Sequence, residues 1–341
     1  MSLDYISVIV PCRNERGHIG PFLDSVLDQD TAGMDWEIII ADGMSDDGTR
    51  EIVAGYGSPR VILIDNPARI VSAGLNAAIR LAKGSIIIRM DCHTEYAPDY
   101  IRACVRILKQ TGAANVGGPA RTRARGFMAR AIAAAYHSRF STGGASFHNE
   151  TFEGWVDTVT YGCWLKSKLE SFGMFDEVLV RNQDDELNLR MIRGGEKIWQ
   201  SPAIVSWYSP RGSLSTLFRQ YFQYGFWKIP VIRKHRIPAS WRHLIPGSFV
   251  IGNIALLMAA FFLPRAFAAW TATTALYLLG SFSAASVAAK QHGWDLILVL
   301  PVVFAVYHIS YGLGFLYGML YWPVAGTQPR QIGKTFTAIS R

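Results

Sequence analysis

Acidic residues are nearly missing from the second part of this 341-residue chain. Of its 26 Asp and Glu residues, all but Asp295 lie at or before Glu196, whereas Lys and Arg continue to the C-terminus. The first 196 residues therefore have the composition of an ordinary soluble α/β domain, and the rest is basic, aromatic and then almost purely apolar. The formal charge of +8 is compatible with nucleic-acid binding, but the basic residues stand beside hydrophobic spans and not in an isolated stripe. The imbalance favours a lipid bilayer as a partner and argues against nucleic acid.

Several familiar signatures are also absent. The four cysteines show no C-x-x-C spacing, so neither a zinc site nor a redox pair is indicated, and the chain fits a reducing compartment. No G-x-G-x-x-G follows the first predicted strand and no G-x-x-x-x-G-K-[ST] occurs, which disfavours a dinucleotide-binding Rossmann site and a P-loop. No secretory signal precedes the first strand, so we expect the N-terminal domain to remain in the cytosol.

Short apolar, β-branched runs alternate with helical segments in the first hundred residues. The runs predict strands at residues 6–10, 36–41, 61–64 and 86–90. Helices are predicted between them, at about residues 12–28, 49–56 and 72–82. Strands and helices that alternate through short connections are typical of a mostly parallel, doubly wound α/β sheet.

Asp91 and His93 directly follow the fourth of these strands. Ligands of open α/β sheets bind beyond the carboxyl ends of the strands, and side chains two positions apart on an extended chain point to the same side. A divalent ion that bridges phosphate oxygens needs only one or two protein ligands, because the diphosphate and water complete its shell. The pair therefore indicates a metal site, and the alternative is an Asp that caps the following turn beside a surface His.

Asp42 ends the second strand and opens a turn rich in side chains that bond backbone groups. A carboxylate there can accept hydrogen bonds from a ribose hydroxyl or a base N–H. The alternative is turn and N-cap chemistry for the helix that begins at Thr49, a role that we expect of Asp46 or Asp47. Both interpretations can hold together.

Asp184, Asp185 and Glu186 form a second acidic cluster, which continues into a predicted helix. A helix turns by about 100° per residue, so three consecutive side chains cannot share one environment. At least one should face the crevice. The alternative is capping, because acids favour the first turn of a helix.

The remaining chain is patterned for a membrane. Between Arg211 and Arg242 there are seven Lys or Arg and no acid, interleaved with aromatics, which is typical of helices lying in a membrane interface on anionic lipid. Three apolar spans follow, at about residues 244–263, 266–289 and 296–322, each long enough to cross about 30 Å of hydrocarbon. The basic segment argues for a cytosolic start, but three crossings would leave Arg330, Lys334 and Arg341 outside, against the positive-inside tendency. The number of crossings therefore stays open.

Four ordered motifs resemble family 2 glycosyltransferases of the GT-A fold. They are Val8-Ile9-Val10-Pro11 with Asn14-Glu15, Asp42-Gly43-x-Ser45-x-Asp47-Gly48-Thr49, Gly74-Leu75-Asn76, and Asp91-x-His93. The D-x-H form, with residues 70–76 before it, is most similar to the subgroup of the succinoglycan-biosynthesis glucosyltransferase (ExoA-like). The resemblance implies a GT-A catalytic domain, with a Rossmann-like and mostly parallel sheet, ahead of the membrane region.

The resemblance also implies roles for individual residues. Asp91 binds Mn²⁺ or Mg²⁺ on the diphosphate, and His93 stands where a second Asp is commoner; neutral imidazole is a good Mn²⁺ ligand. In the E-D-x-[DE]-L-x-x-R motif, alignment on Leu187 and Arg190 puts the general base at Asp184, and Gln183 in place of the first Glu favours a lower pKa for it. The expected donor-binding residues are Pro11, Arg13, Glu15, Asp42, Arg69, Asn76 and Asp91.

The acceptor side is expected partly in the basic aromatic segment. Gln223-x-x-Phe226-Trp227 is similar to the Q-x-x-R-W of processive family members, but Phe226 replaces the Arg, which disfavours a processive polymerase. The residues expected to contact the acceptor or the diphosphate are Trp164, Asp185, Arg219, Gln220, Gln223, Tyr224 and Trp227.

These interpretations combine into one hypothesis. The chain is expected to be a metal-dependent, inverting hexosyltransferase that moves a sugar, with glucose from UDP-glucose favoured, to a polyprenyl-diphosphate-linked saccharide in exopolysaccharide or cell-surface glycan synthesis. The expected layout is a cytosolic GT-A domain (residues 1–205), interfacial helices (206–243), transmembrane helices (244–322) and a tail (323–341), in the plasma (inner) membrane. The alternatives are a polyprenyl-phosphate sugar transferase and a non-catalytic membrane protein that binds nucleotide sugars.

Overall fold

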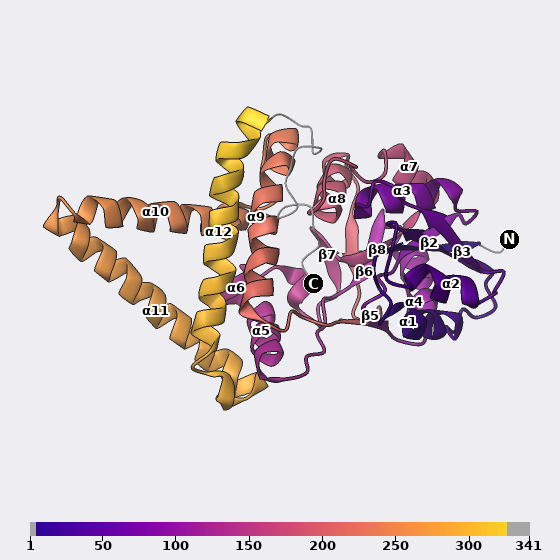
Figure 1. Cartoon of the computed structure of the whole chain (residues 1–341), viewed down its shortest axis with the longest axis horizontal. Helices are drawn as coiled ribbons and strands as arrows, with labels where there is room; N and C mark the ends of the chain where they lie inside the picture. Colours follow the sequence, from indigo (N-terminus) through magenta and orange to yellow (C-terminus); the bar gives the residue numbers. More distant parts are fainter. Residues whose placement is uncertain (1–4, 326–341) are drawn as a thin grey trace. The chain divides into compact units, whose positions relative to one another are not determined.

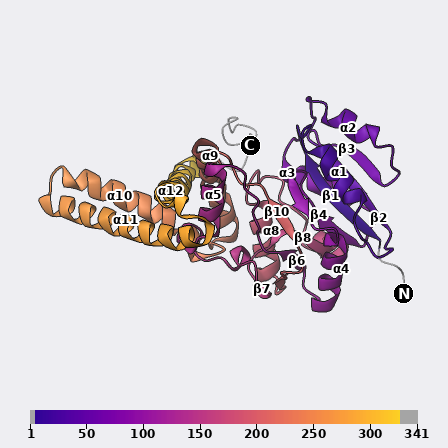
Figure 2. The same ribbon diagram turned by 90° about the horizontal axis from the view of Figure 1, so that it is seen from below.

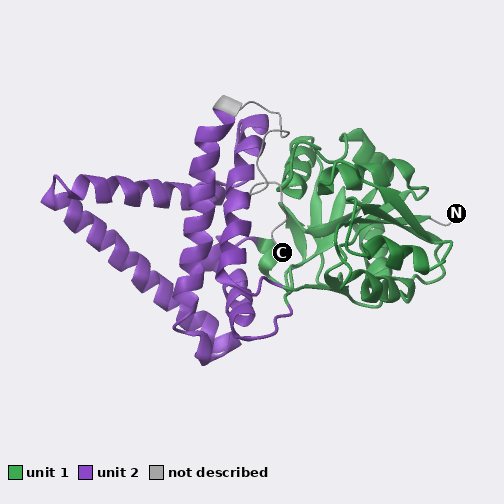
Figure 3. Ribbon diagram, in the orientation of Figure 1, with its two compact units in different colours: residues 1–122, 146–209 green, residues 123–145, 210–341 purple. Residues whose placement is uncertain are grey.

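The structure is a computed structural model that describes residues 5–325 and divides into two compact units (Figure 3). Unit 1 comprises residues 1–122 and 146–209, and unit 2 comprises residues 123–145 and 210–341. The expected boundary at residue 205 is thus shifted to 209, and an internal segment of the expected catalytic domain belongs to the helical unit. The predicted tail from residue 326 onward, with Arg330, Lys334 and Arg341, lies outside the described residues.

Unit 1 is built on a mixed sheet with the strand order β3-β2-β1-β4-β8-β6-β9-β7 (Figure 1). Its strands are β1 (Ile6–Cys12), β2 (Trp36–Asp42), β3 (Val61–Asp65), β4 (Ile86–Arg89), β6 (Asn115–Gly118), β7 (Gly154–Val156), β8 (Thr160–Leu165) and β9 (Ile198–Gln200). The four strands predicted from the sequence form the parallel half, β3-β2-β1-β4. In the other half, β8 runs antiparallel to β4 and β6, and β7 antiparallel to β9. A separate antiparallel pair joins β5 (Thr94–Tyr96) to β10 (Ser206–Tyr208).

Helices cover both faces of the large sheet. They are α1 (Ile19–Leu27), α2 (Thr49–Gly55), α3 (Val71–Leu81), α4 (Tyr100–Thr111), α7 (Lys166–Ser171) and α8 (Gln183–Arg193), with a 3₁₀ turn at Ser146–His148. Val8 on β1 is buried in a core with α1 and α4, and its neighbour Ile9 is buried in a second core with α3 and α8. Because side chains alternate between the two faces, strands that are buried on both sides read as continuous apolar runs.

Unit 2 is helical. Its helices are α5 (Phe127–His137), α6 (Arg139–Thr142), α9 (Leu214–His235), α10 (Ile245–Ala260), α11 (Pro264–His292) and α12 (Leu300–Ala325), with 3₁₀ turns at Trp241–His243 and Trp294–Leu296. Three helical segments, Trp241–Ala260, Pro264–His292 and Leu300–Pro323, are long and apolar enough to cross a membrane. They agree closely with the three predicted spans. Figures 1 and 2 show α10 and α11 as a hairpin whose arms meet at residues 261–263.

The segment at residues 123–145 joins unit 2 because α5 has an apolar face. Ala131, Ile132 and Ala135 are buried in one core with side chains of α9, α11 and α12. Arg130 on the same helix forms an ion pair with Asp295, with 2.9 Å between Nη1 and Oδ2. Asp295, the acid that stands alone in the sequence after Glu196, is therefore the counter-ion of Arg130 on α5.

Helices α9 and α12 approach each other at glycines. A Cβ atom added to Gly225 would lie 2.1 Å from the carbonyl oxygen of Tyr311, and one added to Gly314 would lie 2.0 Å from that of Phe222. No side chain fits at such distances. The two backbones are therefore packed in the way that small residues allow between helices in membranes.

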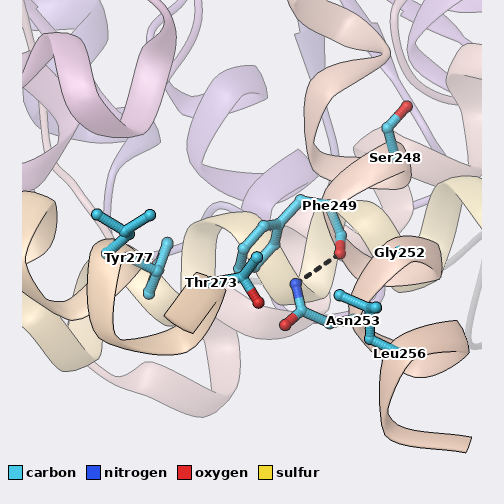
Figure 4. A pocket seen from close by; sticks show the side chains of 8 residues that line it. Ser248, Phe249, Gly252, Asn253, Leu256, Thr273 and Tyr277 are labelled. Carbon is cyan, nitrogen blue, oxygen red and sulfur yellow. Dashed lines mark hydrogen bonds between the residues drawn. The ribbon is translucent and has the colours of Figure 1, made fainter. Parts of the chain in front are cut away.

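A pocket lies between α10 and α11 (Figure 4). The Asn253 side chain donates a hydrogen bond to the Phe249 carbonyl of its own helix, at 2.9 Å, so one N–H of its amide has a partner inside this apolar hairpin. The pocket is lined by Ser248, Phe249, Gly252, Asn253, Leu256, Thr273, Leu276 and Tyr277. None of these is a predicted site residue, so this pocket is not the expected donor site.

Candidate active site

Arg89, the last residue of β4, holds two carboxylates of the predicted site together. Its Nε donates to Oδ1 of Asp91 at 3.1 Å and its Nη2 to Oδ2 at 3.3 Å, while its Nη1 donates to Oδ1 of Asp184 at 2.5 Å. Only 6% of the Arg89 side chain is exposed. The candidate metal ligand and the candidate base, predicted from separate motifs, thus share one guanidinium at the carboxyl end of the central parallel strands.

Sequence reasoning missed Arg89 itself. The signal was present, because a charged residue that directly follows three isoleucines in a buried strand requires a counter-ion. Burial acts to lower the pKa of the Arg89 guanidinium, but Asp184 and Asp91 outweigh that effect and raise it above the ordinary value. The side chain is therefore a permanent positive charge between two carboxylates.

Asp184 lies at the N-terminal end of α8 with 34% of its side chain exposed. Burial raises the pKa of this carboxyl above its ordinary value, and the positive charge of Arg89 opposes the shift without cancelling it. Gln183 adds no negative charge beside this carboxyl, so the lower pKa predicted relative to a neighbouring Glu stays a prediction beside the larger effect of burial. A carboxylate with a raised pKa binds a proton more readily, as a general base requires.

The other two acids of the cluster have different surroundings. Glu186 is fully buried and pairs with Arg190, with 2.6 Å between Oε2 and Nη2. Arg190 also donates to the carbonyl groups of Phe172 and Met174. Glu186 and Arg190 therefore fasten α8 to the segment before it, while Asp185 is half-buried in the first turn of the helix. Of the three acids, Asp184 pairs with the guanidinium at the strand ends.

His93 and Glu15 approach each other beside Asp91. The distance between His93 Nδ1 and Glu15 Oε1 is 3.5 Å, and the Glu15 N–H donates to the Thr49 hydroxyl at 2.8 Å, which fixes the loop after β1. Between residues 5 and 325, no three His, Cys, Asp or Glu side chains gather closely enough to hold a metal by themselves. Asp91 and His93 still offer one oxygen and one nitrogen donor from a single loop, which fits an ion that takes its other ligands from a diphosphate and water.

Asp42 is fully buried at the end of β2. It accepts hydrogen bonds from the Ser45 N–H at 2.9 Å and the Ser45 hydroxyl at 2.5 Å, and it pairs with Arg50 Nη1 at 2.7 Å. Arg50 also pairs with Asp65 at 2.7 Å, so β2 and β3 end in one charged network. Asp47 accepts from the N–H and hydroxyl of Thr49 at the start of α2, which is the turn role expected of it.

The remaining donor-side predictions fall on loops at the same edge. Pro11 is half-buried near the end of β1, and the Arg13 side chain lies against Gly43, where an added Cβ would come within 3.1 Å of it. Arg69 is exposed after β3, in a left-handed conformation with φ of 60°. Pro11 thus lies in β1 itself, and Arg13 and Arg69 follow the carboxyl ends of β1 and β3, where the parallel half of the sheet presents its loops.

Two predicted site residues have structural roles instead. Asn76 is buried and donates to the Phe175 carbonyl and the Glu177 carboxylate, each at 2.8 Å, while its side-chain oxygen accepts from the Phe175 N–H. Trp164 is 1% exposed and packs edge-to-face against Phe175, with 6.1 Å between ring centroids. Ligand contacts were predicted for both, of Asn76 with the donor and of Trp164 with the acceptor or the diphosphate, but both side chains are buried.

The predicted acceptor residues beyond residue 210 lie on α9. Trp227 is fully buried with its ring 5.2 Å from that of Trp322, and Gln223 is 1% exposed. Gln220 donates to the Tyr224 hydroxyl at 3.1 Å, and Arg219 is exposed. Trp227 is therefore a packing residue of unit 2. Acceptor contacts by these α9 residues stay a prediction.

Known proteins resemble this chain in sequence and in fold. The family model for glycosyl transferase family 2 matches residues 7–165. The succinoglycan biosynthesis protein ExoA of Rhizobium meliloti is 33% identical over 243 residues, which cover 70% of this chain and 73% of that protein. The chain belongs to glycosyltransferase family 2. The resemblance drawn from the motifs is thereby confirmed.

Two further proteins, one matched by sequence and one by structure, are similar to nearly the whole of this family 2 chain. The dolichyl N-acetyl-alpha-D-glucosaminyl phosphate 3-beta-D-2,3-diacetamido-2,3-dideoxy-beta-D-glucuronosyltransferase of Methanococcus voltae is 27% identical over 328 residues, 93% of this chain and 98% of that one. The mannosyltransferase PcManGT of Pyrobaculum calidifontis, solved with GDP-Man and Mn²⁺, superposes with a TM-score of 0.59 at 22% identity. The match covers 92% of this chain and 87% of PcManGT. At that identity the second likeness shows the shared GT-A fold.

Proposed function

We propose that this family 2 glycosyltransferase is a metal-dependent, inverting hexosyltransferase that uses a nucleotide-diphosphate sugar and a lipid-linked saccharide. The observation that carries the proposal is the Arg89 bridge, which puts Asp91 and Asp184 on one guanidinium at the carboxyl end of β4. Relatives named for succinoglycan biosynthesis and for transfer to a dolichyl-linked sugar support a lipid-linked acceptor. UDP-glucose is the favoured donor.

The proposed reaction is a single displacement. Asp184 accepts the proton of the acceptor hydroxyl, and the hydroxyl oxygen attacks the anomeric carbon from the face opposite the diphosphate. The bond between the anomeric carbon and the diphosphate oxygen breaks, so the configuration inverts. An oxocarbenium-like transition state is expected by analogy with glycoside hydrolysis.

Asp91 and His93 are the residues that would hold Mn²⁺ or Mg²⁺. When bound, the ion supplies positive charge that neutralises the departing nucleotide diphosphate. Asp42 is the proposed acceptor for hydrogen bonds from the nucleoside. Its carboxylate is fully buried and paired with Ser45 and Arg50, so the nucleoside has to displace one of these partners to reach it.

A location at the cytosolic face of the plasma membrane is part of the proposal. Three helices long enough to cross a bilayer and the acid-free basic segment that contains α9 support it. A lipid-linked acceptor confined to that membrane would then reach the enzyme by diffusion within the plane of the bilayer.

The test supplies membranes containing the protein with labelled UDP-glucose, UDP-galactose or GDP-mannose and a lipid extract. Label should enter a lipid-linked saccharide from one donor, and membranes containing Asp184→Asn should give far less. Label on polyprenyl phosphate itself would favour the polyprenyl-phosphate sugar transferase. Nucleotide binding without transfer from any donor would favour a non-catalytic protein and overturn the proposal.

A further inference from the structure

Arg89 depends on Asp91 and Asp184 for its charge balance. Its neighbour across the ladder on β1 is Ile9, which offers no charge, and its guanidinium carbon lies 5.9 Å from the centre of the Tyr161 ring. All three guanidinium nitrogens donate to one of the two carboxylates. A buried charge requires such pairing, so the two carboxylates and Arg89 form one closed unit.

This closed unit conflicts with the proposed use of Asp91. Both of its oxygens already accept hydrogen bonds from Arg89, so a divalent ion at Asp91 would stand only a few ångströms from a fixed positive charge. Two like charges at that separation repel strongly where little water screens them. Asp184, by contrast, is held through Oδ1 alone, and among the described residues no hydrogen bond reaches its Oδ2.

We propose that Arg89 is a positioning residue that exchanges partners during the reaction cycle. Before the donor binds, it pairs with both carboxylates; when the metal-bearing diphosphate arrives, it gives up Asp91 and stays on Oδ1 of Asp184. Asp184 then keeps its orientation, with Oδ2 directed to the acceptor proton. This inference rests on the proposed function.

The exchange has a consequence for free metal. With Arg89 on Asp91, a divalent ion without nucleotide has to compete with an internal cation, so the site should bind the bare ion weakly. The diphosphate adds the negative charge that makes the exchange favourable. Arg89 thereby makes metal binding conditional on the donor.

The central test replaces Arg89 in the full-length protein in detergent and follows two quantities. Binding of Mn²⁺ alone is measured by electron paramagnetic resonance, and kcat and KM are measured with the labelled donor that the wild type uses. In Arg89→Gln, Mn²⁺ alone should bind about 3- to 10-fold more tightly, because the competing charge is gone. The kcat should fall by at least about tenfold, because the base loses its orientation, with a smaller change in the donor KM. A purely structural defect would weaken both.

Arg102→Gln is the matched control, since Arg102 on α4 makes an exposed ion pair with Asp30 at 2.8 Å. It should leave both quantities as in the wild type. Arg89→Lys keeps the positive charge but lacks the planar guanidinium that pairs with two carboxylates. It should therefore raise the Mn²⁺ affinity and lower kcat, each by less than Arg89→Gln does. If Arg89→Gln does not fold, as judged by thermal unfolding, Arg89→Lys carries the comparison.

A double-mutant cycle tests whether Arg89 acts through Asp184. The variant with both Arg89→Gln and Asp184→Asn should be no slower than Asp184→Asn alone. Additive losses of kcat in the double variant would overturn the partner exchange. So would Mn²⁺ affinity that is unchanged or weaker in Arg89→Gln and unchanged in Arg89→Lys. Absence of transfer by the wild type with every donor would instead refute the proposed function, and the Mn²⁺ titration would still decide the role of Arg89.

Discussion

At the residue scale, the three consecutive acids at the start of α8 should respond differently to loss of charge. Asp184→Asn keeps the shape of the side chain but cannot accept the proton, so its single-turnover rate should fall by about 10²- to 10⁴-fold while donor binding survives. If Asp185 only caps the helix, Asp185→Asn should transfer at nearly the wild-type rate, because a charge in the first turn of a helix contributes only about 0.3–1 kcal/mol of stability; a clear loss of rate would favour its predicted contact with the acceptor or the diphosphate.

Glu186→Gln should lower the stability of the fold, in contrast to the loss of catalysis expected for Asp184→Asn. It breaks a buried pair with Arg190, so the free energy of unfolding should fall by about 3 kcal/mol, seen as a lower thermal midpoint. A wild-type rate for Asp184→Asn, together with a lost rate at position 185 or 186 in a folded protein, would show that the base lies later in the motif.

Metal removal is the second prediction for single residues. Chelation should abolish transfer, and Asp91→Ala should do the same in a folded protein, because His93 alone leaves the ion one protein ligand and no carboxylate charge. His93→Asp should retain some activity and shift the preference between Mn²⁺ and Mg²⁺ toward Mg²⁺, since oxygen ligands suit Mg²⁺ better. Equal transfer with and without chelator would refute the metal hypothesis.

The sequence singled out Asp91 because it follows a strongly patterned strand, and the resemblance to the family motif singled out Asp184 among three consecutive acids. It could not show that Arg89 joins them, because that contact links positions 95 residues apart. It also could not show that the side chains of Asn76 and Trp164 are buried, because burial depends on elements that are distant in the sequence; ligand contacts by these two residues stay predictions.

At the scale of elements, the close packing of α9 on α12 gives a test of unit 2. Gly314→Ala would place a Cβ atom against the Phe222 carbonyl and should separate the two helices, so the thermal midpoint in detergent should drop. Gly252→Ala on α10 is the control, because nothing lies within 4 Å of its added Cβ. An equal effect of both substitutions would mean that helix propensity, and not the close approach, decides the outcome.

Elements with a strong local pattern were the ones that could be predicted. The parallel strands and the three apolar helices agree with the sequence because their periodicity and length are local properties. The placement of α5 in unit 2 was not predictable in that way. Its alanine-rich sequence predicts a helix. The residues of α11 and α12 that bury it, however, lie more than 140 residues further along the chain.

At the scale of the whole molecule, the α5 segment decides how the catalytic unit can be isolated. A fragment of residues 1–209 retains α5 but lacks α9, α11 and α12, so it exposes Ala131, Ile132 and Ala135. Such a fragment should aggregate, because an apolar face of a helix that has lost its partners is open to other chains. Truncation at the end of the sheet is therefore not enough to obtain a soluble enzyme domain.

Replacing residues 124–145 of that fragment with a short linker should prevent the aggregation. The Ala120 N–H donates to the Phe147 carbonyl at 2.8 Å, so the two ends of the excursion already lie together and a Gly-Ser linker of about six residues can join them. The linked fragment should be monodisperse by size-exclusion chromatography without detergent and should bind UDP with Mn²⁺ in calorimetry, whereas the unlinked fragment should precipitate. Aggregation of both fragments alike would mean that unit 1 needs unit 2 to fold. A soluble linked fragment that binds neither UDP nor GDP with Mn²⁺ would instead show that the donor site is incomplete without the helical unit.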